Sequence, residues 1–200
     1  MTDKVLAEKH YDKAFDYWFN QDRKAIKEAR AAIRHDPEWA SPHWLIGTMY
    51  SQVPPIDREA ALREFREAIR KAPLWYLVHY DLGRTLARQA RYEEAIVALR
   101  EALRLKPDSK SGRIELSRCL LKRGNYREAI TTLRGKLSFS HLYTLADAHL
   151  FLAEAISNSN HAVAEARTEW EFILTLDDSI PAYRVARAEA SKRLRETEER

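Results

Sequence analysis

The stretch Tyr76–Pro107, YLVHYDLGRTLARQARYEEAIVALREALRLKP, decides the fold of this chain of 200 residues. Apolar side chains recur three and four residues apart on either side of Gln89–Tyr92, which predicts two amphipathic helices joined by a tight turn. The small residues Gly83 and Ala95 allow these helices to approach each other closely. Pro107 cannot continue a helix and therefore marks the end of the unit.

This unit is repeated along the chain. Residues of the same kind lie 34 positions apart in several sets: Ala61, Ala95 and Ala129; Phe65, Leu99 and Leu133; Gly83 and Ser117; Pro73 and Pro107. A period of about 34 residues marks a helix-turn-helix unit copied in tandem. Because stacked copies bury a continuous core, we expect one elongated domain over residues 1–200.

The spacing predicts five approximate repeats followed by one further helix. The repeats span 3–37, 40–73, 76–107, 110–138 and 141–178, and a capping helix is expected over 180–200. The second repeat is two residues longer than the third because the segment 53–56, Val-Pro-Pro-Ile, enlarges its turn. This segment is either a contact point for a partner or a drift in loop length. In the fourth repeat, Lys136 and His141 replace the expected alanine and proline.

The pattern of each unit resembles the tetratricopeptide repeat. The positions that carry the resemblance in the third unit are His79, Leu82, Gly83, Leu86, Ala95, Leu99, Ala102 and Pro107. The resemblance implies an all-α fold, namely a right-handed superhelical solenoid of four to five antiparallel helix pairs with a C-terminal capping helix. About eleven helices are expected. It also implies a non-catalytic module for protein–protein interaction, such as an adaptor or scaffold.

Composition excludes several other classes of protein. The net charge is only +4, from 34 basic and 30 acidic residues, which disfavours a nucleic-acid partner. The single cysteine, Cys119, cannot form an internal disulfide or a thiolate zinc site. No apolar run approaches the roughly 18 residues of a membrane span, and the N-terminal residues are too charged for a signal peptide. We therefore expect a cytoplasmic protein that does not enter a membrane.

The chain lacks the motifs of catalytic and cofactor sites. The five glycines are scattered rather than gathered in a phosphate-binding loop. His141 and His149 could share a helix face, but eight residues place them about 12 Å apart, too far for one metal ion. No enzyme activity, cofactor or metal is expected.

The candidate binding site is the concave groove that the first helices line in such arrays. The resemblance implies that first-helix residues outside the packing positions face this groove: Trp44, Thr48, Tyr80, Asp81, Arg84, Arg88, Glu115, Arg118 and Lys122. Arginine binds carboxylates bidentately, and aromatic side chains anchor apolar residues. These residues predict a protein or peptide partner with acidic residues.

Two other interpretations stay open. The groove cations could merely be paired with Asp81 and Glu115, since exposed ion pairs are common and weak. The chain could also be a self-associating subunit of a larger assembly, because the ends of repeat arrays are exposed. RNA binding by the basic residues is a third, weaker hypothesis, which predicts a steep dependence on salt.

Overall fold

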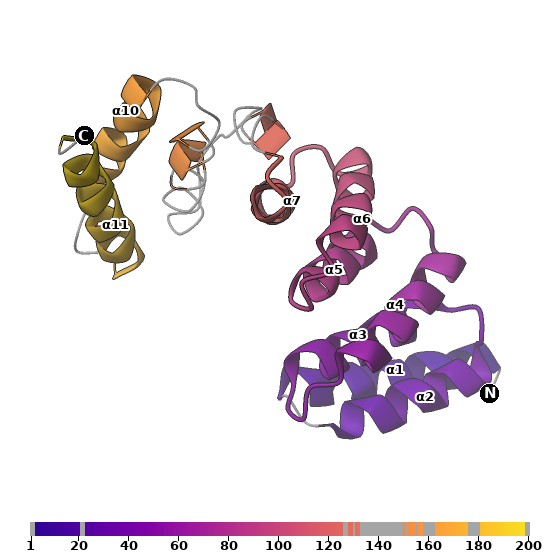
Figure 1. The fold of residues 1–200 in the computed structure, drawn as a ribbon. Helices are drawn as coiled ribbons and strands as arrows, with labels where there is room; N and C mark the ends of the chain where they lie inside the picture. Colours follow the sequence, from indigo (N-terminus) through magenta and orange to yellow (C-terminus); the bar gives the residue numbers. More distant parts are fainter. Residues whose placement is uncertain are drawn as a thin grey trace. The chain divides into compact units, whose positions relative to one another are not determined.

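The computed structural model describes residues 3–20, 23–125, 128–129, 131–132, 150, 152–154, 156–157, 163–175 and 181–198. Within these ranges every regular element is a helix (Figure 1). The chain divides into two compact units, residues 1–107 and 108–200, whose positions relative to one another are not determined. Each unit is therefore described by itself, and the superhelical handedness and the single continuous domain stay predictions.

The first unit consists of three antiparallel helix pairs (Figure 1). Its helices are α1 Asp3–Phe19, α2 Lys24–His35, α3 Ala40–Gln52, α4 Arg58–Lys71, α5 Tyr76–Ala87 and α6 Tyr92–Leu105. Each first helix packs against its partner, and the second helix of one pair packs against the first helix of the next. The first helices also contact one another, α1 with α3 and α3 with α5. The helices lie within the first three predicted repeats.

Small residues stand where paired helices cross, as the sequence predicts. A Cβ atom added to Gly83 would lie 2.6 Å from Cγ of Leu99, and one added to Gly47 would lie 2.7 Å from the Phe65 ring. Neither distance leaves room for a side chain larger than hydrogen. At the equivalent position in the second unit, Ser117 is fully buried and its hydroxyl donates to the carbonyl oxygen of Ala129 at 3.5 Å.

The turns between paired helices also repeat. Ala90 has φ +59° and Gly124 has φ +75°, and the two residues are 34 positions apart. In each turn the amide that follows the left-handed residue donates to a carbonyl oxygen in the last turn of the helix. Arg91 N donates to Leu86, and Asn125 N donates to Leu120. These left-handed residues end α5 and α7 in the same way.

The enlarged turn of the second repeat is fastened to the first repeat. Arg23 donates through Nη2 to the carbonyl oxygens of Val53, at 3.3 Å, and Pro55. Asp57 then caps α4 by accepting a hydrogen bond from the amide of Ala60 at 2.9 Å. The loop is therefore held by specific hydrogen bonds at both of its ends.

The second unit contains α7 Lys110–Lys122, α10 Val163–Leu174 and α11 Pro181–Glu198. The predicted capping helix is α11, and it packs on α10. Trp170 and Tyr183 are the largest members of the core between them, which also includes Ile114 of α7. The predictions at Leu133, Lys136, His141 and His149 fall outside the described residues. In the part of the chain that is described, no helix combines the length and apolar composition needed to cross a bilayer.

Candidate functional site

Six aromatic side chains of the first unit form a continuous row of ring contacts. Neighbouring ring centroids along the row are 4.6–6.4 Å apart, in the order Trp39, Tyr11, Phe15, Trp18, Trp44 and Trp75. The residues come from α1 and α3 and from the caps that precede α3 and α5. We call this set the aromatic row, and the side of the unit formed by α1, α3 and α5 the first-helix face.

The row is only partly covered. Phe15 is exposed, and the other five rings are half-buried. Such side chains offer a large apolar area with little rotational freedom to lose, which suits contact with a partner. Tilted and edge-on ring pairs hold the row in place before any partner binds, because these geometries are favourable for aromatic pairs.

Most of the row was not among the predicted site residues. Trp44 was, but Phe15, Trp18 and Trp75 were not. The sequence contains a pattern that could have indicated two members of the row. Trp39 and Trp75 each follow a repeat-ending proline by two residues, and they are 36 positions apart. Each occupies the N-cap position of the following first helix without a side-chain capping hydrogen bond, and its ring contacts an aromatic side chain of another helix.

A polar network joins the row to α5. The indole Nε1 of Trp44 donates to Asp81 Oδ2 at 2.8 Å, and Arg84 Nη2 lies 3.3 Å from Asp81 Oδ1. The guanidinium of Arg84 in turn lies over the ring of Tyr80, 5.6 Å from its centroid. Four of the predicted site residues are therefore brought together, and Asp81 is their centre.

Asp81 is a buried carboxyl group with two opposing influences on it. Burial raises the pKa of Asp81 above its ordinary value, and this effect outweighs the hydrogen bond from Trp44 and the positive charges of Arg84 and Arg88, which lower the pKa. Because the side chain is 5% exposed, it orients its neighbours rather than meeting a ligand directly.

The remaining predicted residues of the first unit lie in two different environments. Arg88, immediately after α5, is exposed. Thr48 is only 2% exposed, and its hydroxyl has no hydrogen-bond partner among the described residues. Thr48 is therefore covered by its surroundings rather than open on the first-helix face.

In the second unit, α7 repeats part of the pattern. Arg118 Nη1 lies 3.6 Å from Glu115 Oε1, and Lys122 is exposed. Cys119 is buried, which raises the pKa of its thiol to about 11, with a further contribution from the negative charge of Glu115. A thiol in this setting is a packing residue rather than a nucleophile.

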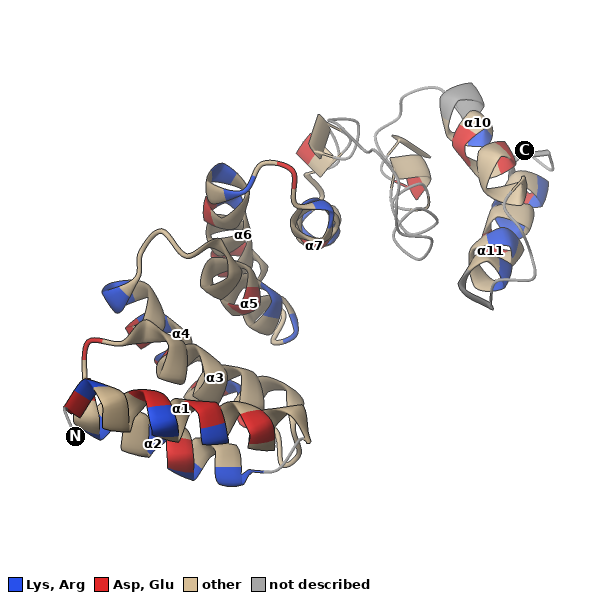
Figure 2. Ribbon diagram, turned by 180° about the vertical axis from the view of Figure 1, so that it is seen from behind, with Lys and Arg blue, Asp and Glu red and all other residues tan. Residues whose placement is uncertain are grey.

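The helices that carry the site bear charges of both signs. Figure 2 shows acidic and basic segments interleaved along the helices of the first unit. Among the described residues, no group of three or more histidine, cysteine or acidic side chains is arranged to hold a metal ion. The site therefore combines half-buried aromatic rings with an arginine that is paired with Asp81.

Two family models, both for the tetratricopeptide repeat, match residues 57–110 and 86–135. Residues 57–135 of the chain belong to the tetratricopeptide-repeat family. Proteins of this family are modules for protein interaction and are typically not enzymes. No curated protein sequence matches the chain significantly.

Solved structures of tetratricopeptide-repeat proteins share its fold. The crystal structure of MamA has a TM-score of 0.75 and 16% identity, and the alignment covers 84% of this chain and 90% of MamA. That of YrrB, described as a TPR protein with an unusual peptide-binding site, has a TM-score of 0.74 and 18% identity, with 90% of each chain covered. At these identities the likeness establishes the fold alone, which confirms the all-α repeat architecture predicted from the sequence.

Proposed function

We propose that this tetratricopeptide-repeat protein is a non-catalytic adaptor or scaffold that docks a peptide segment of another protein on its first-helix face. The observation that carries the proposal is the aromatic row, joined through Trp44 to the buried Asp81 and the arginine that it holds. A cytoplasmic location, as expected from the sequence, accompanies this proposal.

The chemistry of this face favours a peptide with both apolar and acidic side chains. Tryptophan, tyrosine and arginine are the residues that dominate binding energy at protein interfaces. The ion pair with Asp81 fixes Arg84, whereas Arg88 is exposed and has no carboxylate within 4.0 Å among the described residues. We infer that Arg88 receives an acidic residue of the peptide beside an apolar anchor on the row. In the second unit, we propose separately that Arg118 and Lys122 of α7 bind acidic residues of a peptide.

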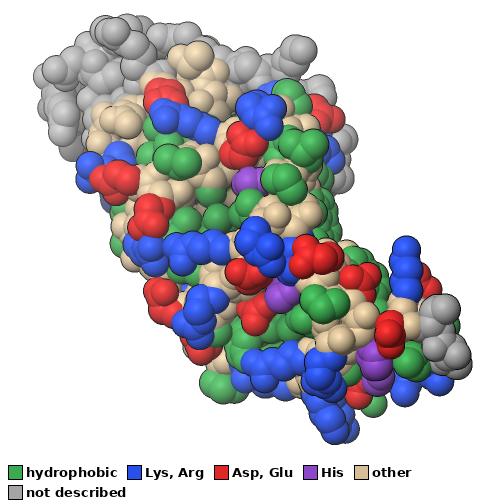
Figure 3. All heavy atoms as spheres, turned by 90° about the vertical axis from the view of Figure 1, so that its right-hand side faces the viewer, with side chains coloured by type: hydrophobic (Ala, Val, Ile, Leu, Met, Phe, Trp, Pro, Cys, Tyr) green, Lys and Arg blue, Asp and Glu red, His purple; other side chains and the backbone are tan. Residues whose placement is uncertain are grey.

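The comparison with YrrB supports this proposal at the level of the fold. YrrB is described as having an unusual peptide-binding site, and it has the same fold as this chain. The surface shown in Figure 3 carries basic, acidic and apolar side chains interspersed over most of its area. Such a mixed surface suits a peptide better than a nucleic-acid backbone, which is bound by a patch of one sign.

The test is a titration with peptides selected from a random twelve-residue library displayed on phage. Binding of a selected peptide is measured by calorimetry for the wild type and for a Y80A/R88Q variant. We expect the dissociation constant to rise by about tenfold or more, because an aromatic contact and a charged contact are lost. Equal affinity of both proteins, with unchanged circular dichroism, would contradict docking on the first-helix face.

A second candidate function, self-association, is favoured by a separate observation. Phe19 is 80% exposed, and Val5 and Phe15 on the same side of α1 are also exposed. An apolar helix face of this kind is suited to contact with a second copy of the chain. Light scattering across a range of concentrations tests it, since a molar mass that stays at 23.3 kDa would exclude self-association.

A further inference from the structure

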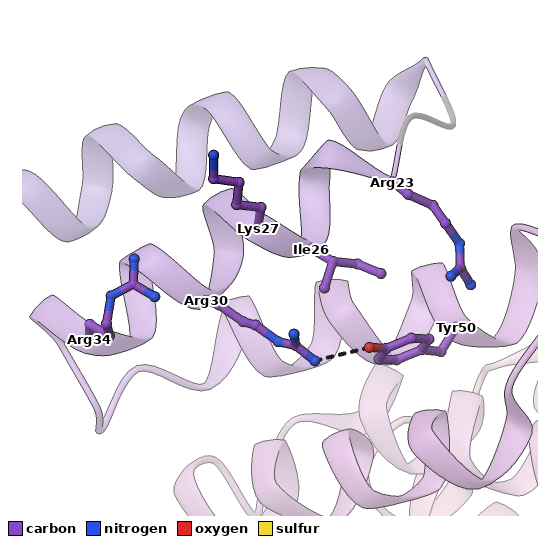
Figure 4. Close-up of a pocket in the computed structure, with 6 residues that line it drawn as sticks. All are labelled: Arg23, Ile26, Lys27, Arg30, Arg34 and Tyr50. Atoms are coloured by element: carbon purple, nitrogen blue, oxygen red, sulfur yellow. Dashed lines mark hydrogen bonds between the residues drawn. The ribbon is translucent and has the colours of Figure 1, made fainter.

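A stripe of cations runs along one side of α2, away from the residues of the aromatic row. Arg23, Lys27, Arg30 and Arg34 follow one another at intervals of four, three and four residues, so they share one helix face about 16 Å long. With Ile26 and Tyr50 they line a hollow of about 370 Å³ (Figure 4). Lys27, Arg30 and Arg34 are exposed, and we call these three the α2 stripe.

The same stripe recurs on the next second helix, where two of its three cations lie within 4.0 Å of a carboxylate. Arginines occupy the positions 36 residues further on, which are Arg63, Arg66 and Arg70 of α4. There Arg70 pairs with Glu67 at 3.0 Å, and Arg66 lies 3.9 Å from Glu94 of α6. The third pair of helices repeats the first of these interactions, since Arg104 pairs with Glu101 at 2.7 Å.

Neither acidic partner has an equivalent beside the α2 stripe. Ala31 of α2 stands at the position equivalent to Glu67, and Ala60 of α4 stands at the position equivalent to Glu94. The one acidic residue of α2, Glu28, is bound to His10 of α1 at 2.7 Å. As a result, no carboxylate among the described residues lies within 4.0 Å of the side-chain nitrogens of the α2 stripe.

The hollow beside the stripe presents hydrogen-bond donors. Arg30 Nη2 donates to the hydroxyl oxygen of Tyr50 at 3.0 Å, which leaves the hydroxyl proton of Tyr50 to be donated elsewhere (Figure 4). The guanidinium of Arg23 lies 5.5 Å from the centroid of the same ring while it holds the 53–56 loop. Tyrosine at position 50 is specific to this repeat, because the equivalent residue 36 positions later is Leu86.

We propose that the α2 stripe, with Tyr50, is a second docking site, which binds an acidic segment of a partner protein. The carboxylates of this acidic segment would lie beside the α2 stripe as Glu67 and Glu94 lie beside α4. Arginine can bind a carboxylate through two parallel hydrogen bonds. The floor of the hollow is apolar, formed by Ile26 and the Tyr50 ring, and it fits the methylene groups of glutamate. The net charge of the whole chain is only +4, which favours a protein segment over a nucleic acid.

The experiment measures the binding of a fluorescein-labelled twelve-residue oligoglutamate peptide by fluorescence anisotropy at low salt. Three variants of the full chain are compared with the wild type. The α2 variant carries K27Q, R30Q and R34Q. The α4 variant removes the same charge at the equivalent positions and carries R63Q, R66Q and R70Q. The third is the Y80A/R88Q variant of the first-helix face. Circular dichroism establishes that all remain helical, as expected because glutamine is a good helix former.

We expect the α2 variant to raise the dissociation constant by about tenfold or more, and the α4 variant to change it by less than about twofold. Y80A/R88Q, which removes one cation of the first-helix face, should raise it by less than the α2 variant does. An equal loss in the α2 and α4 variants would show a response to net charge alone and would overturn the proposal. Unchanged affinity of the α2 variant would also overturn the proposal. A loss of affinity confined to Y80A/R88Q would overturn it as well, because it would assign recognition of acidic residues to the first-helix face. Displacement of the peptide by oligothymidylate of equal charge at equal concentration would instead assign the stripe to nucleic acid.

Discussion

At the scale of single residues, the two turns at Ala90 and Gly124 adopt one backbone conformation with two different side chains. Both have positive φ, where a residue with a Cβ is strained by about 1–2 kcal/mol. Nothing lies within 4 Å of a Cβ built on Gly124, so the backbone alone determines the preference for glycine there. Substitutions at these two positions therefore measure the free-energy cost of the left-handed conformation.

Exchanging the residues of this pair should change stability in opposite directions. We expect A90G to raise the free energy of unfolding by about 0.5–1 kcal/mol, because relief of strain exceeds the added entropy of the unfolded chain. We expect G124A to lower it by about 1 kcal/mol. Urea denaturation followed by circular dichroism measures both. A destabilising A90G would mean that the turn at residue 90 is not left-handed in solution.

Asp81 gives a prediction about pH. Since burial holds its pKa above the ordinary value, the folded chain binds a proton that the unfolded chain has released. The contribution of Asp81 to the free energy of unfolding is therefore fully present below the unfolded pKa of 3.8 and is lost as pH rises through the folded pKa. A D81N variant lacks this titration but keeps an oxygen to accept from Trp44.

We accordingly expect D81N to gain stability relative to the wild type as pH is raised from about 3 to about 7. Parallel denaturation curves at several pH values measure the difference. The opposite trend, with the wild type gaining as pH rises, would show that the hydrogen bond from Trp44 and the charge of Arg84 outweigh burial.

At the scale of helices, the crossing of α5 and α6 depends on one missing side chain. Gly83 allows Leu99 to fill the space between the helices, and Leu99 is fully buried. Adding a methyl group at residue 83 should cost about 1–3 kcal/mol through overpacking, part of which the higher helix propensity of alanine offsets. Truncating Leu99 to alanine should cost about 2–5 kcal/mol by leaving a cavity.

A double-mutant cycle tests whether the two residues share this space. We expect G83A/L99A to lose less free energy of unfolding than the sum of the single variants, because the added methyl group enters the cavity that L99A creates. Additive losses would indicate that residue 83 does not face Leu99. G47A with L99A is the matched control and should be additive, since Gly47 meets Phe65 instead.

The helices and their crossings could be predicted from the sequence because both depend on local pattern. The three-and-four spacing, Pro107 and the 34-residue period place α3 to α7 to within a few residues of their observed bounds. The burial of Thr48 could not be predicted in this way. The equivalent residue 36 positions later, Arg84, is partly exposed, so the burial of Thr48 depends on its shorter side chain and on the side chains packed around it.

At the scale of the whole molecule, the likeness to a family predicted the fold but only part of the candidate site. The contact of Trp44 with Asp81 joins residues 37 positions apart, and it exists because α3 and α5 lie side by side. Glu67 and Glu94 lie beside two arginines of α4, whereas Ala31 and Ala60 stand at the equivalent positions beside the α2 stripe. This difference between the repeats depends on ion pairs in the folded chain, so the sequence period alone could not predict it.

The central claim, that a peptide docks on the aromatic row, can be tested with intrinsic fluorescence. Four of the five tryptophans belong to the row, so a W170F variant reports from the row alone. We predict that a selected peptide shifts the tryptophan emission of this variant and that the shift saturates at the dissociation constant found by calorimetry. Binding by calorimetry with no change in emission would contradict docking on the first-helix face.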